Sequence, residues 1–128
     1  MARKPRAAAR AATPLKPPPD GAVVRMYRIG HGDCFLIAFS GERPEKPAYV
    51  LIDCGYKPGS PDKLSSPTTA KEVGADIIAV TGGFVDLAIV THEHQDHVNG
   101  PGLMVGKVWF PWTENPKDDV ANTLRQKF

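Results

Sequence analysis

Three of the four histidines of this chain and one aspartate fall within six positions, at His92, His94, Asp96 and His97. In an extended segment, residues i and i+2 point to the same side, so His92 and His94 can direct both imidazoles at one point. A turn into a helix would then let Asp96 and His97 face a second point nearby. Imidazole and carboxylate groups are the ligands of zinc and related divalent metals. The spacing therefore predicts a site for two metal ions.

The chemistry that such a site supports is hydrolysis. A bound ion lowers the pKa of its water from 15.7 toward about 7 and polarises the carbonyl or phosphoryl group under attack. The alternative is a polar surface turn after a strand, which explains one or two of these residues but not four at ligand spacing. We therefore interpret this segment as the metal centre of a hydrolase.

Apolar runs separated by turn residues predict the sheet that positions this segment. We expect strands at 22–29, 34–39, 49–52, 84–90 and 105–110. The first three form an antiparallel meander, with Ser40 to Pro47 as a polar connector, and the fourth joins the same sheet. The run from Phe84 to Val90 is typical of a buried strand, and it leads directly into His92.

Two helices complete the expected elements. The first is opened by Ser66-Pro67, carries Val73 and Ile77 on its apolar face and stops at Gly82-Gly83. The second is expected to open at Asn115-Pro116. Its first turn contains Asp118 and Asp119, and its apolar face contains Val120, Leu124 and Phe128. The apolar pattern of this face continues to Phe128, so we expect the chain to be the amino-terminal part of a larger unit.

The segment from Thr91 to His97 matches the H-x-H-x-D-H signature of the metallo-β-lactamase superfamily of metal-dependent hydrolases. The resemblance covers roughly Val23 to Gly102. Gly30-His31-Gly32-Asp33-Cys34 resembles the G-x-G-D-x turn of the branch that includes the nuclease-like domain of bacterial DNA-uptake proteins. Leu51-Ile52-Asp53-Cys54-Gly55 resembles the strand-end Asp and following Gly of the family. The resemblance implies an α/β (α+β) chain that forms the first half of an αββα sandwich.

Carried over residue by residue, the resemblance implies that His92 and His94 bind a first metal and that Asp96 and His97 bind a second. Asp96 also occupies the position that orients the bridging hydroxide, which makes it the candidate catalytic residue. The resemblance implies two Zn²⁺ ions, with Mn²⁺ or Fe²⁺ as alternatives.

Two further aspartates are expected to support the ligands without binding metal. Asp53 would steady the ligand loop from behind, as buried metal sites require. Asp33 would cap the turn beside it, or form an Asx turn without a catalytic role. His31, between two glycines, is interpreted as a turn histidine rather than an additional ligand.

The sequence also departs from the family pattern. The family completes its site with a further His, a bridging Asp and a final His, and no histidine follows His97 here. Each metal would then have two protein ligands where three are usual. Two functions follow: a hydrolase acting on a small molecule or a phosphodiester, and a truncated, non-catalytic module. A flavodiiron-type redox protein ranks third, because that group has Glu where this chain has His94.

Charged residues are distributed unevenly along the chain. Residues 1–19 carry five basic residues and no acid, whereas residues 20–128 hold 11 basic and 14 acidic residues. We expect a disordered Pro/Ala-rich tail at 1–19 and the amino-terminal part of one domain at 20–128. A transit peptide, a nucleic-acid-binding arm and a mis-chosen start codon are the alternatives for the tail. The sequence shows neither a secretory signal nor a membrane span, so we expect a cytoplasmic protein.

Three packing expectations concern apolar and sulfur-containing side chains. A hairpin register centred on Pro44 places Cys34 and Cys54 side by side, as reduced thiols rather than a disulfide. Trp109 and Trp112 are expected to pack in the core rather than line a groove. Half a sandwich leaves one sheet face uncovered, and we expect self-association through it. The residues expected on that face are Phe35, Ile37, Leu51, Ile89 and Trp109.

Overall fold

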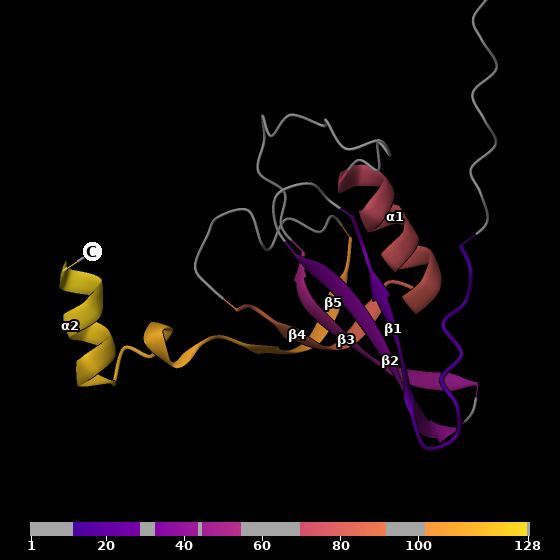
Figure 1. Ribbon diagram of the computed structural model, residues 1–128, viewed down its shortest axis with the longest axis horizontal. Coiled ribbons are helices and arrows are strands. Elements are labelled where there is room, and N and C mark those ends of the chain that lie inside the picture. Colours follow the sequence, from indigo (N-terminus) through magenta and orange to yellow (C-terminus); the bar gives the residue numbers. More distant parts are fainter. Residues whose placement is uncertain (1–11, 29–32, 44, 55–69, 92–101, 128) are drawn as a thin grey trace, which may run out of the picture.

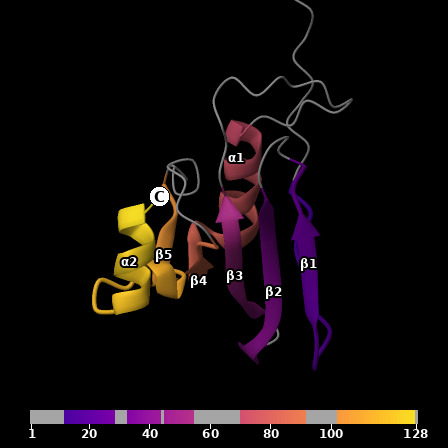
Figure 2. The ribbon, with the colours of Figure 1, turned by 60° about the vertical axis from the view of Figure 1, so that its left-hand side comes forward.

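The computed structural model describes residues 12–28, 33–43, 45–54, 70–91 and 102–127. Its strands are β1 (Ala22–Met26), β2 (Cys34–Arg43), β3 (Lys46–Cys54), β4 (Phe84–Ile89) and β5 (Met104–Trp109). Its helices are α1 (Ala70–Thr81), the short 3₁₀ helix η2 (Trp112–Glu114) and α2 (Asp119–Lys127). The strands form one sheet in the order β1-β2-β3-β4-β5, and α1 lies over one face of it (Figures 1 and 2). The expected mixed α/β class is confirmed, and one helix layer on one sheet is consistent with part of an αββα sandwich.

The sheet changes direction at β3. Strands β1, β2 and β3 pair antiparallel, as the meander predicted, whereas β3–β4 and β4–β5 are parallel pairs. A parallel pair needs a crossover, and α1 lies on the connection between β3 and β4. The carboxyl ends of β3 and β4 therefore lie at the same edge of the sheet, which is the edge that leads to His92.

The β2–β3 hairpin is longer than expected. The polar stretch from Ser40 to Pro47 was predicted as a connector, but most of it continues the two strands, and Arg43 pairs with Lys46. Backbone pairing tolerates these polar side chains because they are largely exposed. Gly41 is required there, since a Cβ at Gly41 would lie 2.2 Å from the carbonyl oxygen of Lys46. At the other side of the sheet, β1 is shorter than predicted and ends at Met26.

Helix α2 begins three residues later than predicted. The Asp118 carboxylate accepts a hydrogen bond from the Ala121 N–H at 2.9 Å and caps the helix. The Asn115 side chain instead accepts the Lys117 N–H at 3.0 Å and forms a turn. Val120 and Leu124 are exposed rather than buried, because α2 stands beyond the edge of the sheet (Figure 1).

The core lies between α1 and the sheet. Val73 and Ile77 of α1 are buried, as predicted, against Leu36 and Leu51 of the sheet. Leu15 joins this core with 6% exposure. The buried Leu15 packs its segment against the domain, and the bounds of the predicted disordered tail at 1–19 stay a prediction. Residues 1–11 lie outside the described part.

An ionic cluster joins β1 to α1. The Arg25 guanidinium lies 2.7 Å from the Asp76 carboxylate, and the Tyr27 hydroxyl donates to the same oxygen at 2.6 Å. Burial of Tyr27 and its hydrogen bond to Asp76 raise the pKa of the phenol above its ordinary value of 10. This cluster holds the edge strand β1 against α1.

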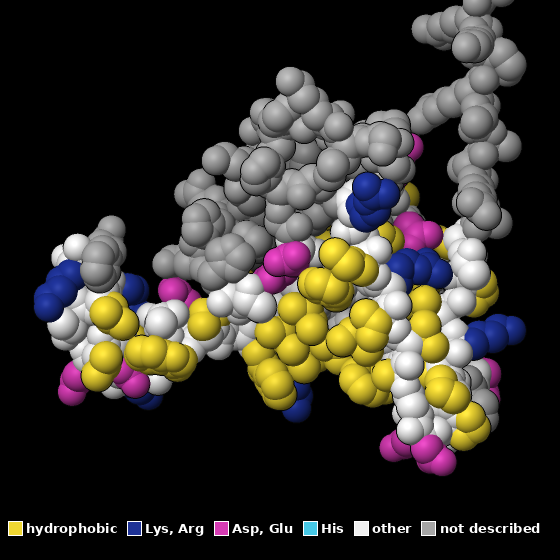
Figure 3. Space-filling model, viewed as in Figure 1, with side chains coloured by type: hydrophobic (Ala, Val, Ile, Leu, Met, Phe, Trp, Pro, Cys, Tyr) yellow, Lys and Arg dark blue, Asp and Glu magenta, His cyan; other side chains and the backbone are white. Residues whose placement is uncertain are grey.

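The opposite face of the sheet carries rows of apolar side chains. One row runs across all five strands through paired residues, and its members are Met26, Phe35, Ile52, Ile89 and Trp109. Trp109 is 60% exposed, which contradicts its predicted core packing and agrees with its expected place on the uncovered face. Trp112 is exposed as well, so its predicted core packing is wrong. Leu51 was also expected here but is buried beneath α1. Apolar side chains gather over this side of the molecule in Figure 3.

Membrane-spanning helices are not found among the described residues: none of the helices there is both long and apolar enough to cross a bilayer.

Candidate metal centre

The edge of the sheet that carries the candidate site is formed by the ends of β3 and β4. Ile52 pairs with Ile89 in the parallel ladder, so Asp53 and Cys54 lie beside Val90 and Thr91. The predicted ligands His92, His94, Asp96 and His97 follow immediately, and they lie outside the described residues. The described residues therefore include the two strand ends that precede the ligand segment, but not the ligands.

Asp53 connects the two strand ends. Its side chain is 4% exposed, and one carboxylate oxygen accepts the Thr91 backbone N–H at 2.9 Å. The other oxygen accepts the Thr91 hydroxyl at 2.5 Å. A buried carboxylate is costly unless its oxygens are hydrogen-bonded, and here both are. Asp53 thereby fixes the residue directly before His92.

A β-bulge directs Asp53 toward Thr91. Phe35 pairs with Ile52 and Cys34 pairs with Cys54, so Asp53 is the extra residue of a bulge in β3. Its φ of 46° is in the left-handed region, which Asp and Asn tolerate better than most residues. The sequence predicts a supporting role for Asp53 but not the bulge, because a positive φ at a non-glycine residue has no clear sequence signal.

Thr91 is the residue that sequence reasoning missed. It was included in the matched segment without a role, yet both its backbone N–H and its hydroxyl bind Asp53. The available signal was a hydroxyl side chain directly after a buried strand and directly before the first predicted ligand. Asp33, by contrast, is exposed before β2. The turn that it was expected to cap, and His31, lie outside the described residues.

Comparison with protein families decides the classification. A family model described as the metallo-beta-lactamase superfamily matches residues 28–127. The chain belongs to the metallo-beta-lactamase superfamily. Searches of curated proteins and of solved structures gave no match.

The described part of this superfamily member holds no group of three or more His, Cys, Asp or Glu side chains arranged to bind a metal. The predicted ligands are outside that part, so the ligand assignment stays a prediction. The observed contribution of the described residues is the Asp53–Thr91 connection that precedes the ligands.

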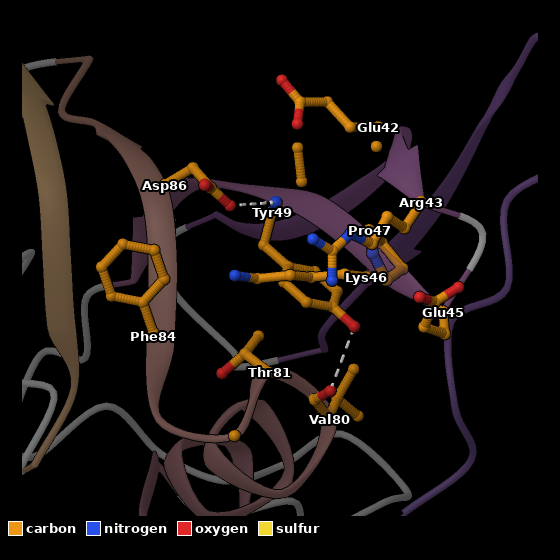
Figure 4. A pocket seen from close by; sticks show the side chains of 13 residues that line it. Glu42, Arg43, Glu45, Lys46, Pro47, Tyr49, Val80, Thr81, Phe84 and Asp86 are labelled. Atoms are coloured by element: carbon orange, nitrogen blue, oxygen red, sulfur yellow. Dashed lines mark hydrogen bonds between the residues drawn. The ribbon is translucent and has the colours of Figure 1, made fainter.

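The superfamily domain also has a cavity of about 770 Å³ at the opposite edge of the sheet (Figure 4). It lies between the β2–β3 turn, the end of α1 and the start of β4. The Asp86 carboxylate in it accepts the Tyr49 N–H at 2.8 Å, and the Tyr49 hydroxyl donates to the Val80 carbonyl at 3.2 Å. These hydrogen bonds join β3 to β4 and to α1, and neither Asp53 nor Thr91 is among the residues that line the cavity.

Proposed function

We propose that this chain carries a metal-dependent hydrolase site in which His92 and His94 bind one metal and Asp96 and His97 bind a second. The observation that supports this most directly is the buried Asp53 carboxylate, which holds Thr91 with both oxygens. A carboxylate kept in that position orders the chain at the point where the proposed ligands begin. Membership of the superfamily supports the reaction class, since its members are mostly hydrolases.

The donor chemistry fits zinc. Neutral imidazoles and carboxylates form zinc sites, and such sites need buried partners that hold the ligands in place. Zn²⁺ is therefore the proposed cofactor, with Mn²⁺ and Fe²⁺ as alternatives. When bound, the metal would acidify a water molecule and polarise the substrate.

The proposed roles of the residues follow from their positions. Asp53 and Thr91 fix the start of the segment, and the two histidines that follow on alternate positions would, in an extended segment, present their imidazoles to the same side. Asp96 is proposed to orient the attacking water by accepting a hydrogen bond from it.

We further propose a phosphodiester as substrate, nucleic acid being one source, with a small-molecule ester or amide as the alternative. The support is the likeness of the sequence from Gly30 to Cys34 to the DNA-uptake branch. A cytoplasmic location belongs to the same proposal.

Zinc titration of the metal-free chain tests the ligand set. Isothermal titration calorimetry in buffers of different ionisation enthalpy should show zinc binding with proton release near neutral pH, as imidazoles lose protons. His94→Ala and Asp96→Ala should each weaken binding at least tenfold. His31→Ala is the matched histidine control and should bind as the parent does. Equal affinity in all four proteins would contradict the ligand assignment.

A non-catalytic module remains the second proposal, and it is favoured by the ligand count. No histidine follows His97 in this sequence, so the H-x-H-x-D-H segment by itself supplies two ligands to each metal. Zinc binding without hydrolysis of bis(para-nitrophenyl) phosphate would support the module, whereas zinc-dependent turnover that is lost in Asp96→Ala would support the hydrolase.

A further inference from the structure

The two cysteines of the chain are direct neighbours across the β2–β3 ladder. Cys34 begins β2, Cys54 ends β3, and the two residues pair in antiparallel register. Opposed residues in such a ladder have Cα atoms about 4.5–5.5 Å apart, which is within the range that disulfides span. Both thiols are reduced in this structure.

The bulge at Asp53 creates this pairing. An uninterrupted ladder continuing from Phe35 and Ile52 would place Asp53 opposite Cys34. The extra residue brings Cys54 opposite Cys34 instead, with the Asp53 carboxylate directed to Thr91. The thiol pair and the Asp53–Thr91 connection therefore depend on the same irregularity in the sheet.

The two thiols differ in environment. Cys34 is fully buried in the core, whereas Cys54 is only partly buried. The neighbouring Cys54 thiol raises the pKa of Cys34, with burial acting in the same direction. The neighbouring Cys34 thiol lowers the pKa of Cys54 against the effect of burial. Cys54 is thus the accessible nucleophile, and Cys34 is the thiol held ready beside it.

We propose that Cys34 and Cys54 form a reversible thiol–disulfide site that is oxidised by low-molecular-weight disulfides. The Cys54 thiolate attacks a sulfur of the small disulfide, forms a mixed disulfide and releases one small thiolate, which takes up a proton. The Cys34 sulfur then loses its proton and attacks Cys54, and the second small thiol leaves. The protein loses two electrons and two protons, and one small disulfide becomes two thiols.

A pair with these properties is suited to redox sensing. Disulfides in reducing compartments are mostly transient, catalytic or sensory. Oxidation would join β2 to β3 beside the bulge, and the closed loop of about 20 residues would constrain the unfolded chain. The oxidised protein should therefore have a higher thermal midpoint than the reduced one, by roughly 10 °C.

The test uses the metal-free 128-residue chain, equilibrated without oxygen in mixtures of reduced and oxidised glutathione. Quenching, alkylation and mass spectrometry should show one transition to a species that lacks two hydrogens, with Cys34 joined to Cys54 in the same chain. For a two-electron couple, the oxidised fraction should rise from about a tenth to about nine tenths over roughly a hundredfold change in [GSH]²/[GSSG]. Thiols that stay reduced in the most oxidising mixture, in protein with native circular dichroism, would overturn the proposal. Disulfides between chains would overturn it as well.

Single variants test the order of the two steps. Cys34→Ser should accumulate glutathione on Cys54, because no second thiol resolves the mixed disulfide. Cys54→Ser should leave the buried Cys34 unmodified in the same mixture, and equal modification of the two variants would overturn the assigned order.

If a variant does not fold, alkylation of the reduced parent protein gives the same information, since Cys54 should be labelled before Cys34. An oxidised parent protein whose thermal midpoint is at or below that of the reduced protein would overturn the proposal, because the native Cys34–Cys54 pairing would then not accommodate the disulfide. None of these readouts depends on metal binding.

Discussion

The carboxylate of Asp53 holds Thr91 by two hydrogen bonds, one from the backbone N–H and one from the hydroxyl. This contact joins the ends of two parallel strands that α1 separates in the sequence. A rigid element thus ends one residue before the first predicted ligand, which is the kind of support that a precise metal site needs.

Substitution of Asp53 should reduce both stability and zinc affinity. Asp53→Ala leaves two donors of Thr91 without this acceptor and places a residue that disfavours the left-handed region at φ 46°. We expect a loss of about 2–3 kcal/mol in the free energy of unfolding, measured by urea denaturation. Asp53→Asn tolerates the same φ and keeps one acceptor, so its loss should be about 1 kcal/mol.

Asp20→Asn is the matched control, because Asp20 is exposed. It should change neither the urea midpoint nor zinc affinity. A double-mutant cycle with Thr91→Val should give a coupling energy of about 1 kcal/mol between positions 53 and 91. Additive effects would show that the hydrogen bond from the Thr91 hydroxyl contributes nothing to stability.

Alkaline pH should destabilise the protein through Tyr27. Burial and the hydrogen bond to Asp76 raise the pKa of this phenol in the folded chain above its unfolded value of about 10. The folded state then holds the proton more tightly than the unfolded state. The stability that Tyr27 contributes is complete below pH about 10 and is lost as the pH rises toward the folded pKa.

Tyr27→Phe isolates this contribution. The variant should lose about 1 kcal/mol at neutral pH, and its stability should fall less steeply above pH 10 than that of the parent. The cysteine thiols, which also titrate at alkaline pH, are retained in both proteins. Parallel pH profiles from thermal unfolding would contradict the prediction.

The sheet face opposite α1 should support self-association of the isolated chain. Met26 and Trp109, at the two ends of the apolar row, are 64% and 60% exposed. Apolar patches of this kind favour association, and two copies related by a two-fold axis could each cover the patch of the other. We propose a dimer through this face, with a weight-average mass that rises with concentration in analytical ultracentrifugation.

Met26→Lys combined with Trp109→Lys should weaken this dimer at least tenfold. Both side chains are exposed, so folding should be little affected. Gln126→Lys, on the exposed side of α2, adds positive charge elsewhere and should leave association unchanged. A monomeric parent protein at all concentrations would refute the proposed interface.

Hydrolysis by residues 1–128 should be a zinc-dependent trace that Asp96→Ala abolishes, whereas zinc binding with no detectable turnover would favour the non-catalytic module. Two ligands per ion hold a metal weakly, and a weakly held metal is poorly positioned for catalysis. The measurement is the initial rate with bis(para-nitrophenyl) phosphate in zinc and in manganese. Robust turnover that is abolished by His94→Ala would show that further ligands reach the site, for example from a second copy of the chain.

Much of the fold could be predicted from the sequence because apolar runs and breaking glycines mark it. The run from Phe84 to Val90 indicated a strand, and Val73 and Ile77 indicated the buried face of α1; both are confirmed. The strand is less buried than predicted, because Val85 is its one buried residue and Phe84 is 40% exposed. The continuation of the β2–β3 hairpin through Ser40 could not be predicted, because backbone pairing there proceeds without apolar side chains.

Exposure was predicted less well than secondary structure. Trp112 was assigned to the core and Trp109 both to the core and to the uncovered face, because whether such a residue is covered depends on what packs against it; both are exposed. At the candidate site, too, residue types could be predicted and tertiary contacts could not. The residue types pointed to Asp53, while the bulge that directs it and the partner Thr91 depend on tertiary pairing of β3 with β4.

The Asp53–Thr91 contact also has a consequence for the order of folding. Its partners are 38 positions apart, whereas the β2–β3 hairpin brings together residues that are near one another in the sequence. Closing the longer loop costs more entropy and must wait until α1 has crossed the sheet and β4 has docked. The hairpin with its two thiols can therefore form early, and the start of the ligand segment is fixed late. Metal added to a refolding chain should then speed the last kinetic phase and leave hairpin formation unchanged.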